Sequence, residues 1–257
     1  MRLVLGLLWA TLVALGAEDR PRLVIAYEDS PSPPYVNPDG TGLDLVLVRE
    51  ACTTLNIELR LECLPWKRCL VMLEAGKLDV LSSASFTAER NAFARYPELD
   101  DGTLDAQRQL HTDTYALYRP IGSSLHWDGQ RLHGLQGPIG AQSGFSVIAQ
   151  LTALGATVDD SSKHLAPIIE RMLAGRVVGA AFMVTAAEAH LRANPGLSTT
   201  IERLDPPLIE KPYFLIFSRQ TYVNQAALCE SVWHTMAVIR GSEEHRKRMR
   251  EAGLLVP

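Results

Sequence analysis

The chain has 257 residues, and its 25 Lys and Arg against 29 Asp and Glu give a formal net charge of −4 at pH 7. This mildly acidic balance excludes the basic electrostatic footprint by which proteins bind nucleic acid or anionic lipid. Hydrophobic residues make up 47% of the sequence, which is ample material for a core in each of two lobes. Nucleic acid is therefore not among the expected partners.

Residues 1–16 have the composition of a secretory signal peptide. Arg2 precedes an apolar run over 3–15, and small residues stand at the two positions that a signal peptidase reads, before the charged Glu18. An apolar run of roughly thirteen residues is too short for a helix that spans a bilayer. A buried N-terminal helix and a short membrane anchor are the alternatives. We expect a signal peptide at 1–16, a mature chain from Ala17 and a periplasmic location.

Strand and helix patterns alternate between residues 22 and 83. Hydrophobic residues recur with period two or at helical spacing, and they predict strand 22–28, helix 43–55, strand 59–63, helix 66–76 and strand 78–83. Strands that alternate with helices in this way form a parallel sheet with right-handed crossovers. We expect a first α/β lobe here.

The same succession starts again at residue 138. It predicts strand 138–142, a helix over 144–154 that opens at Ser143-Gly144, strand 156–158, helix 165–173 and strand 177–182. Extended segments at 110–119 and 213–217 flank this second unit and are typical of two hinge strands. Two further helices are expected at 228–239 and 242–251.

Together these elements predict an α/β fold with two lobes. The expected boundaries are 17–112 for the N-terminal part of lobe 1, 113–212 for lobe 2, and 213–257 for the return to lobe 1 and the C-terminal helices. Each lobe has a mixed, mostly parallel sheet flanked by helices, and two hinge strands join the lobes. Ligands bind at the carboxyl ends of strands in open α/β folds, so we expect a cleft between the lobes that closes by hinge motion.

Four cysteines would be exposed to an oxidising compartment. Cys63 and Cys69 flank a strand-to-helix turn, which predicts a short-loop disulfide, with Cys52 as the alternative partner of Cys69. No C-x-x-C or paired histidine spacing supports zinc, so no metal site is expected. Cys229 is interpreted as a small buried apolar residue on a C-terminal helix.

Short motifs in a fixed order give the chain a family resemblance. The motifs are Pro34-Tyr35, Gly42-Leu43-Asp44, Pro65-Trp66-Lys67-Arg68, Gly76-Lys77-Leu78-Asp79, Thr87-Ala88-Glu89-Arg90 and Gly140-Ala-Gln-Ser-Gly144. Over residues 22–254 this order resembles the family-3 extracellular solute-binding proteins, whose best-known members serve ABC transporters for polar amino acids. The resemblance implies a periplasmic-binding-protein-like fold of type II. It also implies a monomer that binds a small-molecule ligand and a membrane permease as its partner.

Arg90 is the central candidate for ligand binding, because a guanidinium can hold a carboxylate with two parallel charge-assisted hydrogen bonds. Ser83 and Ser85 end the preceding strand and are placed to line the same pocket. In the family, the matching positions hold the carboxylate and amino group of the ligand, and the position of Trp66 packs on its side chain. The alternatives are a surface pair of Arg90 with Glu89, lobe packing of Trp66 and small strand residues for the two serines.

Two other segments are candidates for the same site. A helix that begins at Ser143, Gly144 and Phe145 would present free N–H groups and a positive dipole to an anion, as this turn does in the family. Ordinary capping by Ser143 is the alternative. Glu28 and Asp29 end the first strand, where an acid can meet a ligand cation, and solvated loop charges are the alternative.

One departure from the family concerns the ligand. Amino-acid binders of this family carry an Asp in lobe 2 for the ammonium group, but the stretch from Gly175 to Met183 has valine and methionine where acids would stand. An ammonium group without a carboxylate in a closed cleft would cost several kcal/mol. Either Glu28, Asp29 or Glu188 substitutes, or the ligand is not an ordinary α-amino acid.

Two other functions are the alternatives to binding for transport. An enzyme of dehydratase type on the same scaffold would need a general acid, for which Glu28, Asp29 and Glu188 are the candidates. Motifs for a catalytic nucleophile or a cofactor are missing, and the seven histidines are scattered and interpreted as solvated or structural. We therefore expect no enzyme and no cofactor. A stand-alone sensor that signals to a membrane partner is the other alternative.

Overall fold

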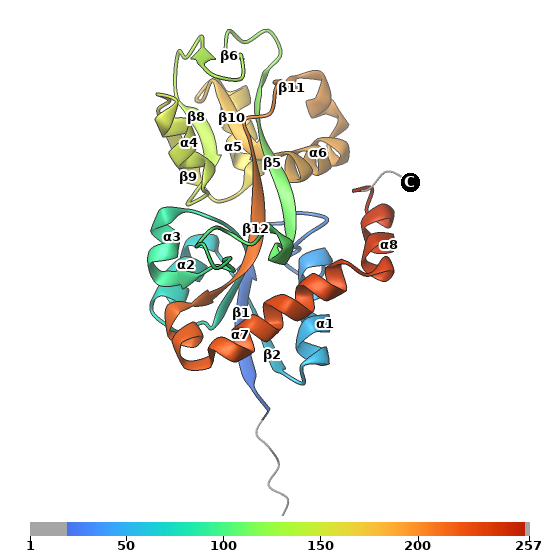
Figure 1. The fold of residues 1–257 in the computed structure, drawn as a ribbon. Coiled ribbons are helices and arrows are strands. Elements are labelled where there is room, and N and C mark those ends of the chain that lie inside the picture. The colour runs from blue at the N-terminus through green and yellow to red at the C-terminus, as the bar shows by residue number, and fades with distance from the viewer. Residues whose placement is uncertain (1–19, 255–257) are drawn as a thin grey trace, which may run out of the picture.

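The computed structural model describes residues 20–254, so the expected signal peptide at 1–16 lies outside the described residues. Two groups of elements are stacked along the long axis of the molecule, and two long strands run between them (Figure 1). We call the group with β1 lobe 1 and the group with β8 lobe 2. In the described part of the chain, no helix has both the length and the apolar composition needed to cross a membrane.

Lobe 1 begins with the predicted strand–helix succession. Its elements are β1 (Arg22–Glu28), α1 (Leu43–Thr54), β2 (Glu58–Leu64), α2 (Trp66–Glu74), β3 (Val80–Ser85), α3 (Ala88–Phe93) and β4 (Ala94–Arg95). Strand β1 pairs in parallel with both β2 and β3, so the carboxyl ends of the three strands meet at one edge. The parallel sheet predicted for this region is confirmed, and its upper edge is where ligands bind in open α/β folds.

Lobe 2 repeats this arrangement with three parallel strands. Its elements are β6 (His126–Trp127), β7 (Leu132–His133), β8 (Ile139–Gln142), α4 (Val147–Ala153), β9 (Val158–Ser162), α5 (Leu165–Leu173), β10 (Gly179–Met183), α6 (Val184–Ala193) and β11 (Ile201–Arg203). Strand β8 pairs in parallel with β9 and with β10. One-turn 3₁₀ helices lie at Ala106–Arg108 and Pro195–Thr199.

The start of α4 corrects a prediction. The helix begins at Val147 and not at Ser143-Gly144. Gly144 has φ +77°, a left-handed conformation that ends regular structure and that glycine adopts without strain. The N–H of Phe145 donates to the carbonyl of Gln142 at 3.1 Å, so residues 143–146 form a turn between β8 and α4.

Strands β5 (His111–Pro120) and β12 (Ile209–Ser218) connect the two lobes. They pair with each other in antiparallel fashion, while β12 also pairs with β3 and β5 also pairs with β10. One continuous mixed sheet results, in the order β2-β1-β3-β12-β5-β10-β8-β9. The α/β fold with two connecting strands is therefore confirmed.

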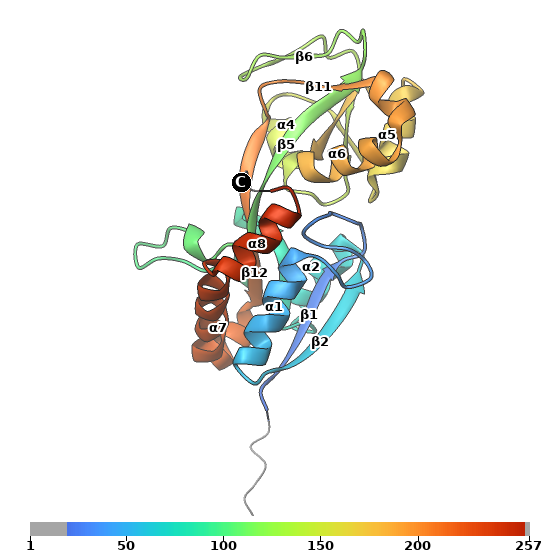
Figure 2. The ribbon, with the colours of Figure 1, turned by 90° about the vertical axis from the view of Figure 1, so that its right-hand side faces the viewer.

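Two C-terminal helices complete lobe 1, α7 (Arg219–Arg240) and α8 (Glu243–Glu251). Helix α7 packs along α1 on one side of the sheet (Figure 2). Trp233 of α7 is fully buried, and its indole N–H donates to the carbonyl of Leu215 at 2.7 Å. Val48 and Cys52 of α1 are buried in the same hydrophobic cluster. This close-packed layer of helices supports the lobe 1 part of the sheet.

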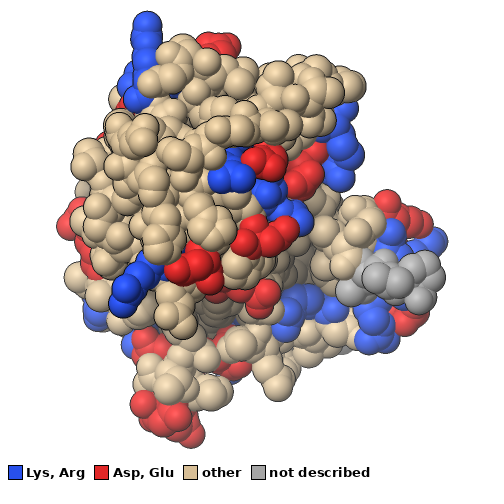
Figure 3. Space-filling model, turned by 90° about the horizontal axis from the view of Figure 1, so that it is seen from above, with Lys and Arg blue, Asp and Glu red and all other residues tan. Residues whose placement is uncertain are grey.

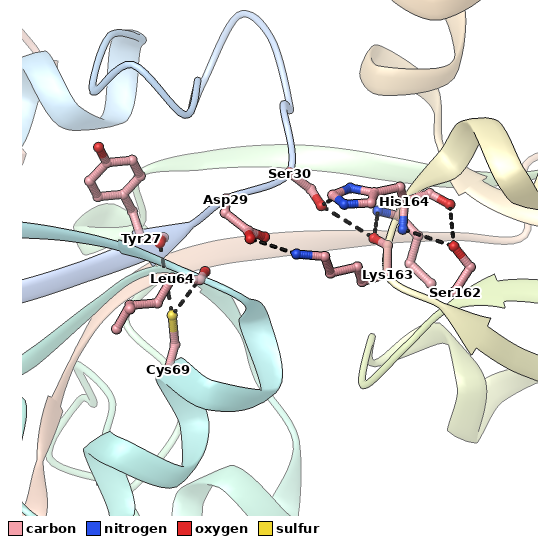
Figure 4. Close-up of polar contacts among 9 residues, drawn as sticks. Tyr27, Asp29, Ser30, Leu64, Cys69, Ser162, Lys163 and His164 are labelled. Atoms are coloured by element: carbon pink, nitrogen blue, oxygen red, sulfur yellow. Dashed lines mark hydrogen bonds and ion pairs between the residues drawn. The ribbon is translucent and has the colours of Figure 1, made fainter.

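The expected disulfide is not formed in this structure. All four cysteines are free thiols. Cys69 is fully buried on α2, and its Sγ donates to the carbonyls of Leu64 and Tyr27 (Figure 4), whereas Cys63 is exposed on β2. Cys52, the alternative partner of Cys69, is buried among the side chains of α1 and α7. Neither of the two predicted bridges is present in this structure.

Candidate functional site

A small pocket lies between the lobes, above the carboxyl ends of β1 and β3. Its cavity volume is about 40 Å³. The lining residues are Glu28, Ser30, Ser32, Tyr35, Val36, Trp66, Ser82, Ser83, Ser85, Arg90, His111, Tyr115, Phe145, Ser146, Met183 and Tyr213. The set includes six of the eight predicted ligand-binding residues, namely Arg90, Ser85, Ser83, Trp66, Glu28 and Phe145.

Arg90 lies inside the molecule, with 5% of its surface exposed. It stands in the first turn of α3, where Thr87 caps the helix by accepting from the Arg90 N–H. Its Nη1 donates to the carbonyl and hydroxyl of Ser85 at 2.8 and 3.2 Å, and its Nη2 donates to the carbonyl of Gly144 in lobe 2 at 3.0 Å. The guanidinium therefore touches both lobes at the pocket.

Trp66 and Phe145 form an aromatic wall beside this guanidinium. The Arg90 guanidinium carbon lies 5.0 Å from the centroid of the Trp66 ring, which is cation–π geometry. Phe145 of lobe 2 meets Trp66 edge to face, with the ring centroids 6.4 Å apart. The indole N–H of Trp66 donates to the Gly144 carbonyl at 3.2 Å. Trp66 thus packs between the lobes and lines the pocket, so both interpretations of this residue describe part of its environment.

The predicted serines of β3 have different roles. Ser85 is buried, and its hydroxyl lies 2.8 Å from that of Ser146, so the two lobes meet there too. Ser83 has φ +59°, an uncommon conformation for a residue with a side chain. Its hydroxyl donates a short hydrogen bond to the carboxylate of Asp44. Ser83 is therefore turned toward α1 at the floor of the pocket.

Within residues 20–254, Glu28 is a buried carboxyl group with one unpartnered oxygen. It ends β1 at the pocket, and its buried Oε1 has no hydrogen-bond partner among the described residues. Burial, together with the nearby charge of Asp29, raises the pKa of Glu28 to about 8. A carboxyl group in this environment is mostly protonated at neutral pH.

The predicted turn 143–145 contributes less than expected. Ser143 and Gly144 do not line the pocket; Ser143 contacts Asp160, and Gly144 offers its carbonyl to Arg90 and Trp66. The N–H groups of Ser143 and Phe145 donate to the carbonyls of Ser162 and Gln142, so these two are not free to bind an anion as at a helix start. Ser146, just beyond the predicted segment, is the lobe 2 residue that meets Ser85.

A stack of three rings was missed by the sequence analysis. His111 lies between Tyr35 and Tyr213, at centroid distances of 3.6 and 4.8 Å and with nearly parallel planes. Its Nδ1 is 3.0 Å from the carboxylate of Asp44. Gly42 allows this arrangement, because with φ +118° it brings α1 against the Tyr35 backbone, where a Cβ atom would collide. The motif Gly42-Leu43-Asp44 was the signal in the sequence, but the partner on β5 could not be found from spacing.

Asp29 and Glu188 are both engaged away from the pocket. Asp29 of lobe 1 forms an ion pair with Lys163 of lobe 2 at 2.7 Å (Figure 4). Glu188 accepts from the hydroxyl of Tyr118 at 3.2 Å and lies 3.5 Å from Arg203. Met183, at the position where an acid was expected, lines the pocket. Of the three substitutes considered, Glu28 is the one whose side chain lines the pocket.

Further contacts close the gap between the lobes beside the pocket. The hydroxyl of Ser30 lies 3.0 Å from Nδ1 of His164 and donates to the carbonyl of Lys163 at 3.2 Å (Figure 4). Lys67 lies 3.5 Å from Asp160. These contacts join the loop after β1 and the start of α2 to β9 and the segment that follows it, so the two lobes touch on this side of the pocket.

The charges on the face seen from above are mixed. Basic and acidic side chains lie close to one another there, beside a broad area of other residues (Figure 3). Neither sign of charge covers this face, which has no extended basic surface of the kind that binds nucleic acid.

Comparison with known proteins supports the fold. No protein-family model matches the chain, and the search of curated proteins finds no match. AbpA, an amino-acid ABC transporter substrate-binding protein from Streptococcus pneumoniae bound to L-arginine, is 20% identical with a TM-score of 0.67, over 90% of this chain and 94% of its own. The GluR0 ligand-binding core from Nostoc punctiforme in complex with L-glutamate is 15% identical with a TM-score of 0.63, over 90% and 94%.

A third solved structure has a different biological context. A histidine kinase sensor domain with similarity to periplasmic binding proteins is 17% identical with a TM-score of 0.69, over 93% of this chain and 99% of its own. At these identities the likeness shows the fold alone. The chain has a periplasmic-binding-protein-like α/β fold, and its structural neighbours include amino-acid-binding proteins of transporters.

Proposed function

We propose that this protein is an extracytoplasmic solute-binding protein. It captures a small carboxylate-bearing polar ligand, an amino acid or a related compound, by hinge closure of two lobes. Lobe 1 consists of residues 17–112 and 213–257, and lobe 2 consists of residues 113–212. As a periplasmic monomer it delivers this ligand to the permease of an ABC transporter and performs no chemistry on it.

The observation that carries the proposal is a buried cation without a carboxylate partner. Arg90 is 5% exposed, yet no acidic side chain among residues 20–254 forms an ion pair with it, and its hydrogen bonds go to neutral oxygens. Buried charges in proteins are normally paired. A carboxylate from a ligand, gripped by the fork of the guanidinium, supplies the missing negative charge.

A second cation strengthens the preference for an anion. Lys211 on β12 donates to the hydroxyl and carbonyl of Ser146 at 3.0 and 3.3 Å. Burial, and then the charge of Arg90, lower the pKa of Lys211. Glu28 is mostly neutral at pH 7 because its pKa is about 8, so it does not cancel these charges. Arg90 therefore lines the pocket as a cation, and Lys211 lies beside the pocket at Ser146.

The proposal can be tested by thermal unfolding of the mature protein with amino acids, polyamines and small organic acids. A ligand that binds the folded state raises the melting temperature by mass action. We expect the best compound to be a carboxylate, its shift to vanish in Arg90→Ala, and its shift to persist in Arg192→Ala, a change of an exposed arginine on α6. A shift that survives Arg90→Ala would place the site elsewhere.

One observation favours an enzyme as the second candidate. Glu28 is a buried carboxyl with a pKa raised to about 8, and a protonated carboxyl in a pocket is the equipment of a general acid. Incubation of the best compound with the protein, followed by mass spectrometry, separates the two functions. We expect the compound to be recovered unchanged, whereas stoichiometric or catalytic conversion would favour the enzyme.

A further inference from the structure

A second cavity adjoins the pocket. Its volume is about 320 Å³, against about 40 Å³ for the pocket itself. The two share Glu28, Ser30, Ser32, Phe145 and Met183 as lining residues. They are therefore neighbouring compartments of one space, and we call the larger one the side chamber.

The pocket is the smaller part of this joined space. Its volume is about 40 Å³ and that of the side chamber about 320 Å³, so most of the room for a ligand between the lobes lies in the side chamber. The side chamber is the compartment that opens from the shared wall.

The side chamber is built mainly from apolar surface of lobe 2. Ala186 and Ala189 stand three residues apart on α6 and so share one face of that helix. Leu165 and Ala166 at the start of α5 form the adjoining wall. Both helices present small residues here, and larger side chains at the three alanines would fill the space.

Half of the polar side chains that line the side chamber are engaged in hydrogen bonds. The amide of Gln142 donates to the carbonyl of Lys163 at 3.1 Å, and Nδ1 of His164 is 3.0 Å from the hydroxyl of Ser30. The other three, Glu28, Ser32 and His190, stand among eight apolar lining residues. A polar extension of the ligand would therefore exchange water for mostly apolar surface, which is unfavourable. An apolar extension loses no hydrogen bonds there and gains from burial.

We propose that the ligand carries an unbranched alkyl or a single aryl group that occupies the side chamber, while its carboxylate is held by Arg90. This inference rests on the proposed function and narrows its substrate class to amphipathic carboxylates. The side chain at Met183 is consistent with this class. Its thioether lies between the two compartments and can pack against an apolar chain, whereas a carboxylate at this position would lose its hydration.

A homologous series tests the inference. Titration calorimetry would measure Kd for straight-chain 2-amino acids from alanine to 2-aminooctanoate, and for the matching monocarboxylates without the amine. We expect at least one series to bind, with Kd falling by about two- to fourfold for each methylene until the chamber is filled. A Kd that stays constant or rises with chain length overturns the inference.

Matched variants locate the effect. Ala189→Leu narrows the side chamber, while Ala193→Leu makes the same change on the exposed end of the same helix. Ala166→Leu on α5 is the second variant, in case the first fails to fold. We expect Ala189→Leu and Ala166→Leu to abolish the increase in affinity with ligand chain length. Ala193→Leu should retain that increase. An unchanged gain in both chamber variants also overturns the inference.

The outcomes separate this inference from the proposed function. If short carboxylates bind, lose binding in Arg90→Ala and show no gain with length, the proposed function stands and the side chamber is not part of the site. If no member of either series binds while other compounds bind independently of Arg90, both fail.

Discussion

The two lobes contribute different chemistry to one pocket. Lobe 1 supplies Arg90, Glu28 and His111, together with the serines of β3. Lobe 2 supplies Phe145 and Met183, and its polar contribution is the hydroxyl of Ser146. The charged side is thus built on the sheet edge of lobe 1, and lobe 2 forms a mostly apolar cover. Substitutions of pocket residues in lobe 1 should therefore alter the charge that the ligand meets. Substitutions in lobe 2 should alter the packing of apolar surface against the ligand.

The largest expected effect is the pH dependence of stability through Glu28. Burial raises the pKa of its carboxyl in the folded protein to about 8, from an ordinary value of 4.5. Between these values the folded state holds a proton that the unfolded state has lost, so stability falls as pH rises. Glu28→Gln should remove this loss and be more stable than the wild type by up to about 4 kcal/mol at pH 8, with little difference near pH 4.

Chemical unfolding at several pH values measures this difference. Glu170→Gln, an exposed position on α5, is the matched control and should follow the wild type. If Glu28→Gln shows the same pH dependence as the wild type, the carboxyl group is not held neutral by its surroundings.

The next largest effect is expected for the conservative change Arg90→Lys. Lysine keeps the charge but loses the planar fork that bonds to Ser85 and Gly144 at the same time. We expect ligand affinity to fall by roughly 100-fold, since hydrogen bonds to charged groups contribute about 1.5–3 kcal/mol each. Calorimetry against Arg192→Lys checks this, and equal affinity in the two variants would mean that charge alone suffices.

A smaller effect is expected on the lobe 2 side. Phe145→Ala removes the ring that meets Trp66 and that lines both compartments. We expect about a tenfold loss of affinity, because aromatic pairs contribute about 0.5–1.5 kcal/mol beyond area burial. Leu173→Ala, an exposed position on α5, is the control. A loss as large as that of Arg90→Lys would contradict the division of roles between the lobes.

The smallest effect is expected at the ion pair across the cleft. Lys163→Met removes the pair with Asp29, whose side chains are 43% and 25% exposed. Pairs of this exposure contribute about 0–1 kcal/mol, so affinity should fall by at most about fivefold and depend less on salt than in the wild type. Lys247→Met on α8, which breaks a pair that also lies on the surface, should leave affinity unchanged. Equal salt dependence in both variants would show that the cross-lobe pair does not assist closure.

Much of the fold could be predicted from the sequence because its signals are local. The periodicity of 22–83 gives three strands and two helices, and parallel pairing then follows from the alternation of strands and helices. The same logic brought Glu28, Ser85 and Arg90 to one place, since each follows or ends a strand at the same sheet edge.

The remaining features depend on contacts that no local pattern contains. The ring stack joins Tyr35, His111 and Tyr213 from three distant segments. Helix α4 begins at Val147, later than predicted, because Gly144 has a left-handed backbone conformation. The side chamber exists between lobes, so its size follows from their relative placement rather than from the sequence of either.

The pairing of the two connecting strands has a mechanical consequence. Residues 209–213 of β12 pair one to one with residues 115–111 of β5, so the two crossings are not independent tethers. We therefore expect them to move as one ribbon, so that the cleft opens by rotation about a single axis. Tyr115 and Tyr213 belong to this ribbon and also face the pocket. A bound solute would therefore contact the connecting strands themselves. One pair of spectroscopic labels, with one label on each lobe, would then report the opening and closing of the cleft.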